Sequence, residues 1–427
     1  MNDYRRTAMK ILLAPYGTRG DVQPLIALGL ALRERGHIVE FAAPDDFREW
    51  VESFGLPFNP TGIDVKKTLL AAGDNIRSLG WQMRHLYHQL IPIQFNALSR
   101  VVPDADMIVG GGLQFAGPSV AEQRRIPYVP VVYCPVGFPS SYHPAPFVKW
   151  QRLPRIVNKL TWSLGAAAAD LALRRSVNNG REILVLPSIS SPSRNLTSGA
   201  RVILAADRTL SPAPPDLPAN VTVTDALVLE RDDSLDDEVD EFLNSGPPPI
   251  YVGFGSMVTA DTERATTAAM NAALLAGCRL VLGTGWAGLG SDRRDLPAWC
   301  KVVMSTPHHL LFSRCAGIVH HGGAGTTTTA ARAGVPQLIV PHLLDQYYWA
   351  NRVQALGIGP PTLPFDQLTA ARLAERIKAL FKDSSIGVRA ARLGAEVGAR
   401  DGISAAVSVI EKLANSAEVV KGRARNV

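Results

Sequence analysis

A glycine- and threonine-rich stretch over residues 319–329 has the residue types needed to hold an anion. It reads VHHGGAGTTTT, which predicts a strand end, a tight turn and the start of a helix. Gly323 and Gly325 would let a phosphate approach the backbone, and the first N–H groups of a helix favour negative charge. Thr326 and Thr327 add hydroxyl donors. The stretch predicts a phosphate-binding loop; the alternative is a tight turn before a threonine-capped helix.

Two histidines and a second glycine loop refine this prediction. Successive strand residues point to opposite faces, so His320 and His321 cannot both contact one ligand, and one of them should be structural. The loop GFGSM at 253–257 follows the first predicted strand of the same half of the chain. The amides of Gly255 and Ser256, with the serine hydroxyl, would reach the same phosphate from the other side.

Other motifs suggest different chemistry. The segment GTGWAG at 283–288 matches the G-x-G-x-x-G fingerprint of dinucleotide-binding proteins. Pro297 follows too soon for a full helix, and no acidic residue ends a strand about twenty residues later, so we discount the match. An NAD-dependent or other Rossmann-type enzyme stays as an alternative. The histidines between 308 and 342 show no H-E-x-x-H or comparable ligand spacing, so no metal site is predicted.

The predicted elements supply the scaffold for these loops. Those of the first half are strands at 9–16, 37–43, 107–109 and 128–133 and helices at 24–35, 45–54 and 119–125. Those of the second half are strands at 250–254, 279–282, 301–304, 317–320 and 337–340 and helices at 262–276, 326–333 and 348–356. This alternation indicates an α/β fold with two doubly wound parallel sheets, which bind ligands at the carboxyl ends of their strands.

Composition sets the predicted domain boundaries. An acidic and proline-rich linker at 231–247 separates an N-terminal domain, residues 1–230, from a C-terminal domain, residues 248–400. The remainder, 401–427, is predicted to be a helix at 404–413 followed by a frayed basic tail.

Length, charge and cysteine usage exclude several classes of protein. The 427 residues are 46% hydrophobic and 19% charged, which fits two domains and excludes a disordered chain. The 4 cysteines form no C-x-x-C pair, and we expect a cytoplasmic protein without disulfides. No stretch is long enough for a transmembrane helix or a signal peptide. The net charge is +6, yet no Lys/Arg run exceeds two, so no nucleic-acid partner is expected.

The second half resembles the donor domain of the GT-B glycosyltransferases of family 1, which include plant natural-product, bacterial macrolide and glycopeptide, and sterol glucosyltransferases. The matching segments are TPH at 306–308, HGGAGT at 321–326, GVP at 334–336 and DQ at 345–346. GTRGDVQP at 17–24 resembles the opening loop of the sterol and glycopeptide branches. The resemblance implies two Rossmann-like domains facing a central cleft, with the acceptor in the N-terminal domain and the nucleotide sugar in the C-terminal domain.

The same resemblance gives each loop a role. Asp345 and Gln346 would bind the sugar hydroxyls, and His308, with Trp286 as an apolar wall, would meet the nucleobase. Ser305 stands where plant members carry a base-stacking Trp, so UDP and TDP donors both stay open, with UDP-glucose favoured by the opening loop. The residues implied around the diphosphate are Gly255, Ser256, His321, Gly323, Gly325, Thr326 and Thr327.

The resemblance also implies a hexosyl transfer with inversion and without a metal ion or other cofactor. Asp21 follows the first strand, near the place of the catalytic His of plant members, and could act as general base if burial raises its pKa. His321 and the helix start at Thr326 would stabilise the charge of the departing diphosphate. The alternative for Asp21 is a helix N-cap. A non-catalytic nucleotide-sugar-binding protein is the second alternative, against which Asp21 and Asp345 argue.

The acceptor and other partners are less sharply defined. By the same resemblance residues 75–165 should line the acceptor site, and their mixture of aromatic and basic side chains favours a hydrophobic sterol, lipid or polyketide. The basic residues from Lys149 to Lys159 fit either a weak peripheral contact with a membrane or a solvated helix face. The sequence does not set an oligomeric state.

Overall fold

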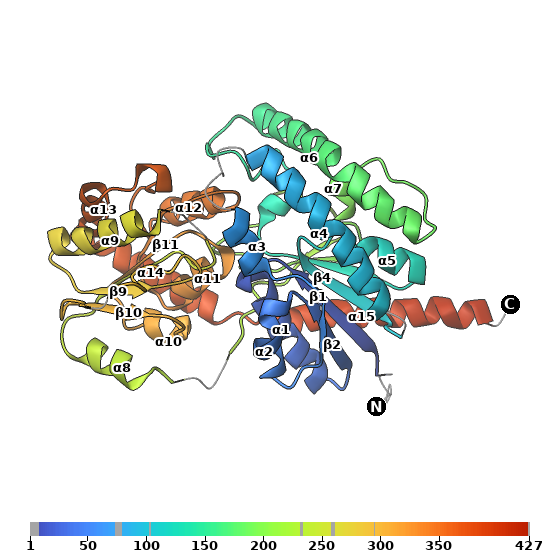
Figure 1. The fold of residues 1–427 in the computed structure, drawn as a ribbon, viewed down its shortest axis with the longest axis horizontal. Coiled ribbons are helices and arrows are strands. Elements are labelled where there is room, and N and C mark those ends of the chain that lie inside the picture. Colours follow the sequence, from blue (N-terminus) through green and yellow to red (C-terminus); the bar gives the residue numbers. More distant parts are fainter. Residues whose placement is uncertain are drawn as a thin grey trace.

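Two parallel β-sheets form the centres of two domains in the computed structural model (Figure 1). The structure describes residues 8–72, 79–101, 104–230, 234–257, 261–293 and 295–425, with the side chains of 70–86 and 416–425 left undescribed. The first sheet has the order β3-β2-β1-β4-β5-β6-β7 and the second the order β10-β9-β8-β11-β12. In each sheet the order reverses beside its first strand in the chain, which is where open α/β sheets bind ligands.

The first sheet is built from residues 10–223. Its strands are β1 (Lys10–Tyr16), β2 (Ile38–Ala43), β3 (Phe58–Pro60), β4 (Met107–Gly112), β5 (Tyr128–Val132), β6 (Val202–Leu204) and β7 (Val221–Val223). The α-helices around it are α1 (Arg19–Glu34), α2 (Arg48–Glu52), α3 (Val65–Ala72), α4 (Leu79–Val101), α5 (Gly117–Arg124), α6 (Arg155–Ile183) and α7 (Pro192–Asn195). Short 3-10 helices cover Asp45–Phe47 and Pro135–Gly137.

The second sheet is built from residues 250–339. Its strands are β8 (Ile250–Gly253), β9 (Leu280–Gly283), β10 (Cys300–Val303), β11 (Gly317–His320) and β12 (Gln337–Ile339). The α-helices of this half are α8 (Asp237–Asn244), α9 (Thr262–Ala276), α10 (His308–Phe312), α11 (Ala324–Arg332), α12 (Gln346–Ala355), α13 (Ala370–Lys382) and α14 (Ser384–Gly398). A 3-10 helix covers Phe365–Gln367, and α15 (Gly402–Arg425) ends the described chain.

Burial on both faces explains why the central strands are almost continuously apolar. Ile11, Leu13, Val109 and Val129 lie in one hydrophobic cluster with α1, while Leu12 and Ile108 of the same strands lie in another, with residues of α4 and α5. A strand that packs helices on both sides has no solvent face to alternate with, which is the pattern of a parallel sheet.

Most predicted elements are confirmed, and their ends differ by a few residues. The helices predicted at 24–35 and 404–413 differ more. The first begins at Arg19, because Thr18 takes the N-cap position, and Pro24 is accommodated within it. The second extends to Arg425, so the prediction of a frayed tail after Leu413 was wrong. Residues 237–244 form α8 instead of a linker and pack Val239 and Leu243 on the second domain.

The last helix returns to the first domain. Ala406, Val407 and Ile410 of α15 are buried in the cluster that contains Leu32 of α1. Arg35 donates two hydrogen bonds to the carboxylate of Glu411, at 3.1 and 3.2 Å. In Figure 1 this red helix runs horizontally across the N-terminal domain and past α1, with which it packs. The C-terminal segment is therefore part of the N-terminal core.

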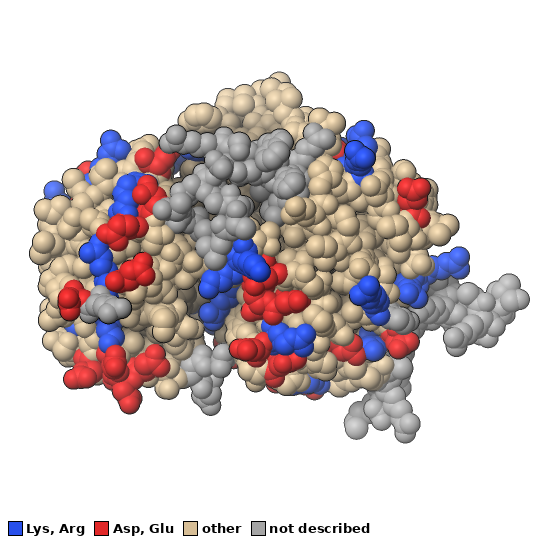
Figure 2. All heavy atoms as spheres, viewed as in Figure 1, with Lys and Arg blue, Asp and Glu red and all other residues tan. Residues whose placement is uncertain are grey.

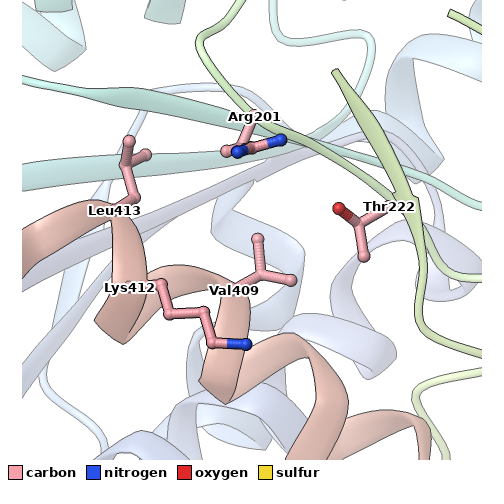
Figure 3. Close-up of a pocket in the computed structure, with 5 residues that line it drawn as sticks. All are labelled: Arg201, Thr222, Val409, Lys412 and Leu413. Atoms are coloured by element: carbon pink, nitrogen blue, oxygen red, sulfur yellow. The ribbon is translucent and has the colours of Figure 1, made fainter. Parts of the chain in front are cut away.

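A pocket of about 280 Å³ opens between α15 and the edge of the first sheet (Figure 3). Arg201 and Thr222 line it from the sheet side, and Val409, Lys412 and Leu413 line it from α15. Arg201 precedes the first residue of β6, so the pocket lies toward the amino ends of the strands. It contains none of the predicted site residues.

Candidate active site

Asp21 lies at the carboxyl ends of three neighbouring strands of the first sheet. A Cβ on Gly17, just after β1, would come within 2.1 Å of its Oδ2. A Cβ on Gly112, at the end of β4, would come within 2.7 Å of its Oδ1. After β5, the hydroxyl of Tyr133 donates to the Asp21 carbonyl oxygen at 2.9 Å. A side chain at either glycine would therefore collide with the Asp21 carboxylate.

The N-cap alternative for Asp21 requires a correction. The N-cap of α1 is Thr18, and Asp21 is the third helical residue, whose Oδ2 accepts a hydrogen bond from the Thr18 N–H at 2.7 Å. This is the carboxylate half of a capping box. One oxygen of Asp21 thus fixes the side chain, while Oδ1 stays on the side of Gly112.

Asp21 and Asp345 face each other from the two domains. Burial raises the pKa of Asp21 to about 7, and the negative charge of Asp345 raises it as well, against the lowering effect of the Thr18 hydrogen bonds. Burial also raises the pKa of Asp345 to about 6, although its Oδ2 accepts a hydrogen bond from Trp349 Nε1 at 3.2 Å. Two carboxylates with pKa values raised this far are typical of a reaction centre.

Other loops meet across the same interface. The rings of Trp286, after β9, and Phe47, after β2, lie 6.3 Å apart. The charge of Arg19, beside Asp21 in the opening loop, helps to lower the pKa of His308 in the second domain. The carboxyl ends of both sheets therefore meet where the two domains touch.

The two histidines at the end of β11 have different environments. His320 is fully buried, its Nε2 lies 3.0 Å from Gln337 Oε1, and its Nδ1 accepts from the Gly322 N–H at 3.1 Å. His321 is buried too, but its Nδ1 has no hydrogen-bond partner. Burial lowers the pKa of His321 well below its usual value, so the imidazole is neutral. His320 is the structural residue of the pair, and His321 has a nitrogen left for a ligand.

Two predicted glycines make room for the ring of His321. A Cβ on Gly255 would lie 2.9 Å from His321 Cε1, and Gly255 also has a φ of +60°. A Cβ on Gly323 would lie 2.4 Å from His321 Nε2. The loops after β8 and β11 thus hold the imidazole between their backbones, as the prediction of one shared phosphate site requires.

The start of α11 differs in detail from the prediction. Gly323 is the N-cap and the helix begins at Ala324, so Gly325 and Thr326 are in its first turn. Thr327 is fully buried and its hydroxyl donates to the Gly323 carbonyl oxygen at 2.8 Å. That hydroxyl stabilises the helix start, whereas Gly325 is exposed and Thr326 and Ser256 are partly exposed.

The side chains of Asp345 and Gln346 have different environments. Gln346 is buried, and its Oε1 accepts from the N–H groups of His342 and Leu343 at 2.7 and 3.1 Å. Its side chain therefore shapes the loop before α12. Leu344 in that loop has a φ of +51°, a strained conformation for leucine. The loop presents the half-buried Asp345 toward the first domain.

The residues predicted to meet the nucleobase contact other aromatic side chains. His308 stacks on Phe312 with ring centroids 4.6 Å apart, and its Nε2 lies 3.3 Å from the Tyr251 hydroxyl. Burial lowers its pKa to about 3. Trp286 is directed at Phe47 of the first domain. Contacts of His308 and Trp286 with a base stay predictions.

Sequence reasoning missed Gly112, Tyr133 and Thr306. Gly112 and Tyr133 hold Asp21, and the triple glycine that ends the strand at 107–112 was the available signal. Thr306 has a buried hydroxyl without a partner, in a segment that the resemblance had already marked.

The predicted acceptor region divides into three parts. Trp81 and Arg84 lie outside the described side chains. Tyr87, Phe95 and Phe138 belong to the hydrophobic clusters of the first domain or pack against them, whereas other aromatic residues of the region are exposed, namely Tyr142, Phe147 and Trp150.

The described residues offer neither a cluster of metal ligands nor a membrane-spanning helix. No group of three or more His, Cys, Asp and Glu in this part of the chain is arranged to hold a metal ion. Over the same residues, every helix is too short or too polar to cross a bilayer.

Comparison with known proteins identifies the family of the chain. A sequence model of the glycosyltransferase family 28 N-terminal domain matches residues 11–136, and one of the erythromycin biosynthesis protein CIII-like C-terminal domain matches residues 281–413. The chain is 35% identical to vancomycin aglycone glucosyltransferase of Amycolatopsis orientalis, over 85% of this chain and 89% of that protein. It is 30% identical to sterol 3-beta-glucosyltransferase UGT80A2 of Arabidopsis thaliana, over 96% of this chain and 66% of that protein.

A solved structure gives the same picture of the fold. The glycosyltransferase VinC, crystallised with dTDP, superposes with a TM-score of 0.67 over 96% of this chain and 100% of that one, at 23% identity. The chain thus combines two parallel-sheet domains with Asp21 in the first turn of α1 and a histidine-glycine loop before α11. The chain belongs to the GT-B glycosyltransferases, in the family that includes the glycopeptide and sterol glucosyltransferases.

Proposed function

We propose that the chain transfers a hexose from a nucleoside diphosphate donor, UDP-glucose or a TDP-sugar, to a hydroxyl of a hydrophobic acceptor, with inversion and without a metal ion. The observation that carries the proposal is the placement of Asp21. Its carboxylate is fixed by Thr18, has a pKa near 7 and lies at the domain interface opposite Asp345. A general base that works near neutral pH needs such a pKa.

The proposed reaction is a single displacement. Asp21 takes the proton of the acceptor hydroxyl while the hydroxyl oxygen attacks the anomeric carbon of the sugar. The bond from that carbon to the diphosphate oxygen breaks, and the nucleoside diphosphate leaves with the electron pair. Attack opposite the leaving group inverts the anomeric configuration.

The leaving group would be stabilised by neutral hydrogen-bond donors. The first turn of α11 offers free N–H groups and the positive end of the helix dipole. His321 is neutral, so it would act through an N–H donor and not as a cation. Because the imidazole of His321 is uncharged, burying it between the two glycine backbones requires no desolvation of a charge. The ring can therefore be fixed in place before the donor binds.

We expect His321→Ala to weaken binding of UDP or TDP by roughly 10- to 100-fold, the effect of losing a hydrogen bond to a charged group. Isothermal titration calorimetry measures it. His320→Ala is the matched comparison: it leaves the Gly322 N–H and Gln337 without their partner and should lower the melting temperature instead. Unchanged nucleotide affinity in His321→Ala would contradict the assignment.

The pH dependence of the rate tests Asp21 separately. The base must be ionised, so we expect kcat/KM to rise with pH through about 7, the pKa of Asp21. The profile should be measured over a range in which the fold is stable by circular dichroism. A rate that is already maximal near pH 5 would exclude a base with this pKa.

The relatives guide the choice of donor and acceptor. The two matched relatives are named for glucosyl transfer to a glycopeptide aglycone and to a sterol, and the similar solved structure holds dTDP. A thermal-shift panel of UDP, TDP, GDP and NAD is the first test, followed by mass spectrometry of donor consumption with pooled sterols, polyketides and phenols. A mass gain of one hexose on an acceptor supports the proposal.

The alternatives give different outcomes in the same panel. Stabilisation by NAD alone would favour a dehydrogenase, although turns and not a helix follow β9 in the described residues of the G-x-G-x-x-G segment. Stabilisation by UDP or TDP without turnover of any acceptor would favour a non-catalytic nucleotide-sugar-binding protein.

A further inference from the structure

The outward face of α6 is apolar over its first half. Ile156, Leu160, Leu164 and Leu171 have exposed fractions of 79%, 56%, 63% and 75%. At 100° per residue these four positions fall on one side of the helix, and from Ile156 to Leu171 they extend about 22 Å. Soluble helices normally turn such a stripe to the core, whereas α6 buries a different face, including Leu173 and Val177.

The segment before α6 adds two exposed aromatic residues. Trp150 is 74% exposed, and Phe147 packs its ring against α6 where a Cβ on Gly165 would come within 2.4 Å of it, while leaving half of its surface exposed. We call Ile156, Leu160, Leu164 and Leu171 the α6 stripe. An exposed apolar helix face of this length marks a contact with a partner or a membrane.

Charge on and around the stripe is almost entirely positive. Between residues 147 and 181 the sequence has seven Lys or Arg residues and one acidic residue, Asp170. Asp170 is buried and accepts hydrogen bonds from the Ser191 hydroxyl and the Ser193 N–H, at 2.7 and 2.8 Å. The exposed cations are Lys149, Arg152, Arg155 and Lys159 before and at the start of the stripe and Arg174 and Arg175 after its end.

The cations frame the apolar residues without interrupting them. Arg155 lies over the ring of Tyr142 at 4.3 Å, and Lys149 pairs with Asp366 of the second domain at 3.1 Å. In Figure 2 the uppermost part of the molecule, where Figure 1 places one end of α6, is tan, and Lys or Arg side chains stand to its right. An apolar strip bordered by cations, with an exposed tryptophan at one end, is complementary to the interface of an anionic bilayer.

We propose that the α6 stripe docks the protein on anionic membranes, with Trp150 and the leucines in the interfacial region and the flanking cations on the headgroups. The proposal extends the proposed function, because a bilayer is where a lipid-like acceptor would be met. The loop before α6 contacts the second domain through Lys149, so docking places the domain interface next to the membrane. Charge complementarity favours this occupant over an apolar protein partner.

Vesicle binding without donor or acceptor tests the proposal independently of the transfer reaction. We expect the wild-type chain to sediment with phosphatidylglycerol-containing vesicles, and about tenfold less with pure phosphatidylcholine or in high salt. Leu160→Glu with Leu164→Glu should lower the bound fraction on the anionic vesicles by at least about tenfold. Leu274→Glu with Leu275→Glu on α9 is the matched control, since these leucines are 64% and 54% exposed on the other domain.

Two outcomes would decide against docking on a membrane. Equal binding by the α6 variant and the α9 control would mean that the stripe is not the contact. If the wild type does not bind vesicles but forms a dimer in sedimentation velocity that the α6 variant abolishes, the stripe is an interface between two copies of the chain. Glycosyl transfer by the unbound α6 variant to a water-soluble acceptor would retain the proposed function whatever the vesicles show.

Discussion

Asp21→Asn is expected to lower the turnover number by about 10²- to 10⁴-fold, the range that a positioned general base contributes. The amide oxygen can still accept the Thr18 N–H, so the capping box and the start of α1 should persist. The loss should therefore appear in kcat, while calorimetry finds UDP or TDP bound with wild-type affinity. Near wild-type turnover would remove Asp21 from the reaction.

The pH dependence of the melting temperature is a second measurement on Asp21→Asn. The pKa of Asp21 is raised on folding, so the ionised carboxylate disfavours the native state, and stability is lost as pH rises toward about 7. Asn imitates the protonated form. Asp21→Asn should melt at a higher temperature than wild type at pH 8, and the difference should shrink toward pH 5. Asp106→Asn, before β4 at the opposite edge of the sheet, controls for loss of one negative charge.

The second large effect separates two glycines of one loop. Gly323→Ala should weaken nucleotide binding by roughly 10- to 100-fold, because the new Cβ would lie 2.4 Å from His321 Nε2 and displace the ring. The backbone of Gly323 has a φ of −66°, so alanine adds no backbone strain there. The damage should be confined to the position of His321. Titration calorimetry with UDP and TDP measures the loss.

Gly325→Ala should show the opposite combination. A Cβ at this exposed helical position meets nothing within 4 Å, so alanine should raise stability by about 0.5 kcal/mol. If the diphosphate lies against the first turn of α11, the same methyl group should block it and weaken donor binding. Gly387→Ala in α14, also with open space, is the control that should change stability alone. Donor affinity unchanged by Gly323→Ala and Gly325→Ala would contradict the phosphate loop.

The elements that carry the site were predictable because parallel sheets give strong local signals. A short apolar run predicted the strand that ends at His320. The glycines after it predicted the turn, and the change from a strand-like to a helix-like spacing of apolar residues predicted the helix. The rule that ligands bind at the carboxyl ends of strands pointed to the loops after the strands, and the family resemblance named Asp21, His321 and Asp345 in them. The resemblance had already chosen His321 over His320 for the ligand. The physical reason is that His320 is held by Gln337 and the Gly322 N–H, and the sequence alone does not bring these partners together.

Features that depend on distant contacts were not predictable. Gly112 is about ninety residues from Asp21 in sequence, and only the pairing of β1 with β4 brings it to the carboxylate. The helix α6 lacks a clear buried stripe in sequence because its outward face is apolar as well. The helix start at Arg19 was hidden by Pro24, which usually stands in the first turn.

The return of α15 to the first domain has a consequence for the order of folding during synthesis. A ribosome delivers β1 to β7 first, but the surface of α1 around Leu32 stays uncovered until Ala406, Val407 and Ile410 have emerged. The second domain, continuous in sequence, can complete its core before the first. We expect nascent chains that stop near residue 398 to hold a finished C-terminal domain beside an N-terminal domain that still exposes apolar surface, so the N-terminal domain reaches its native state only when the final helix packs on it.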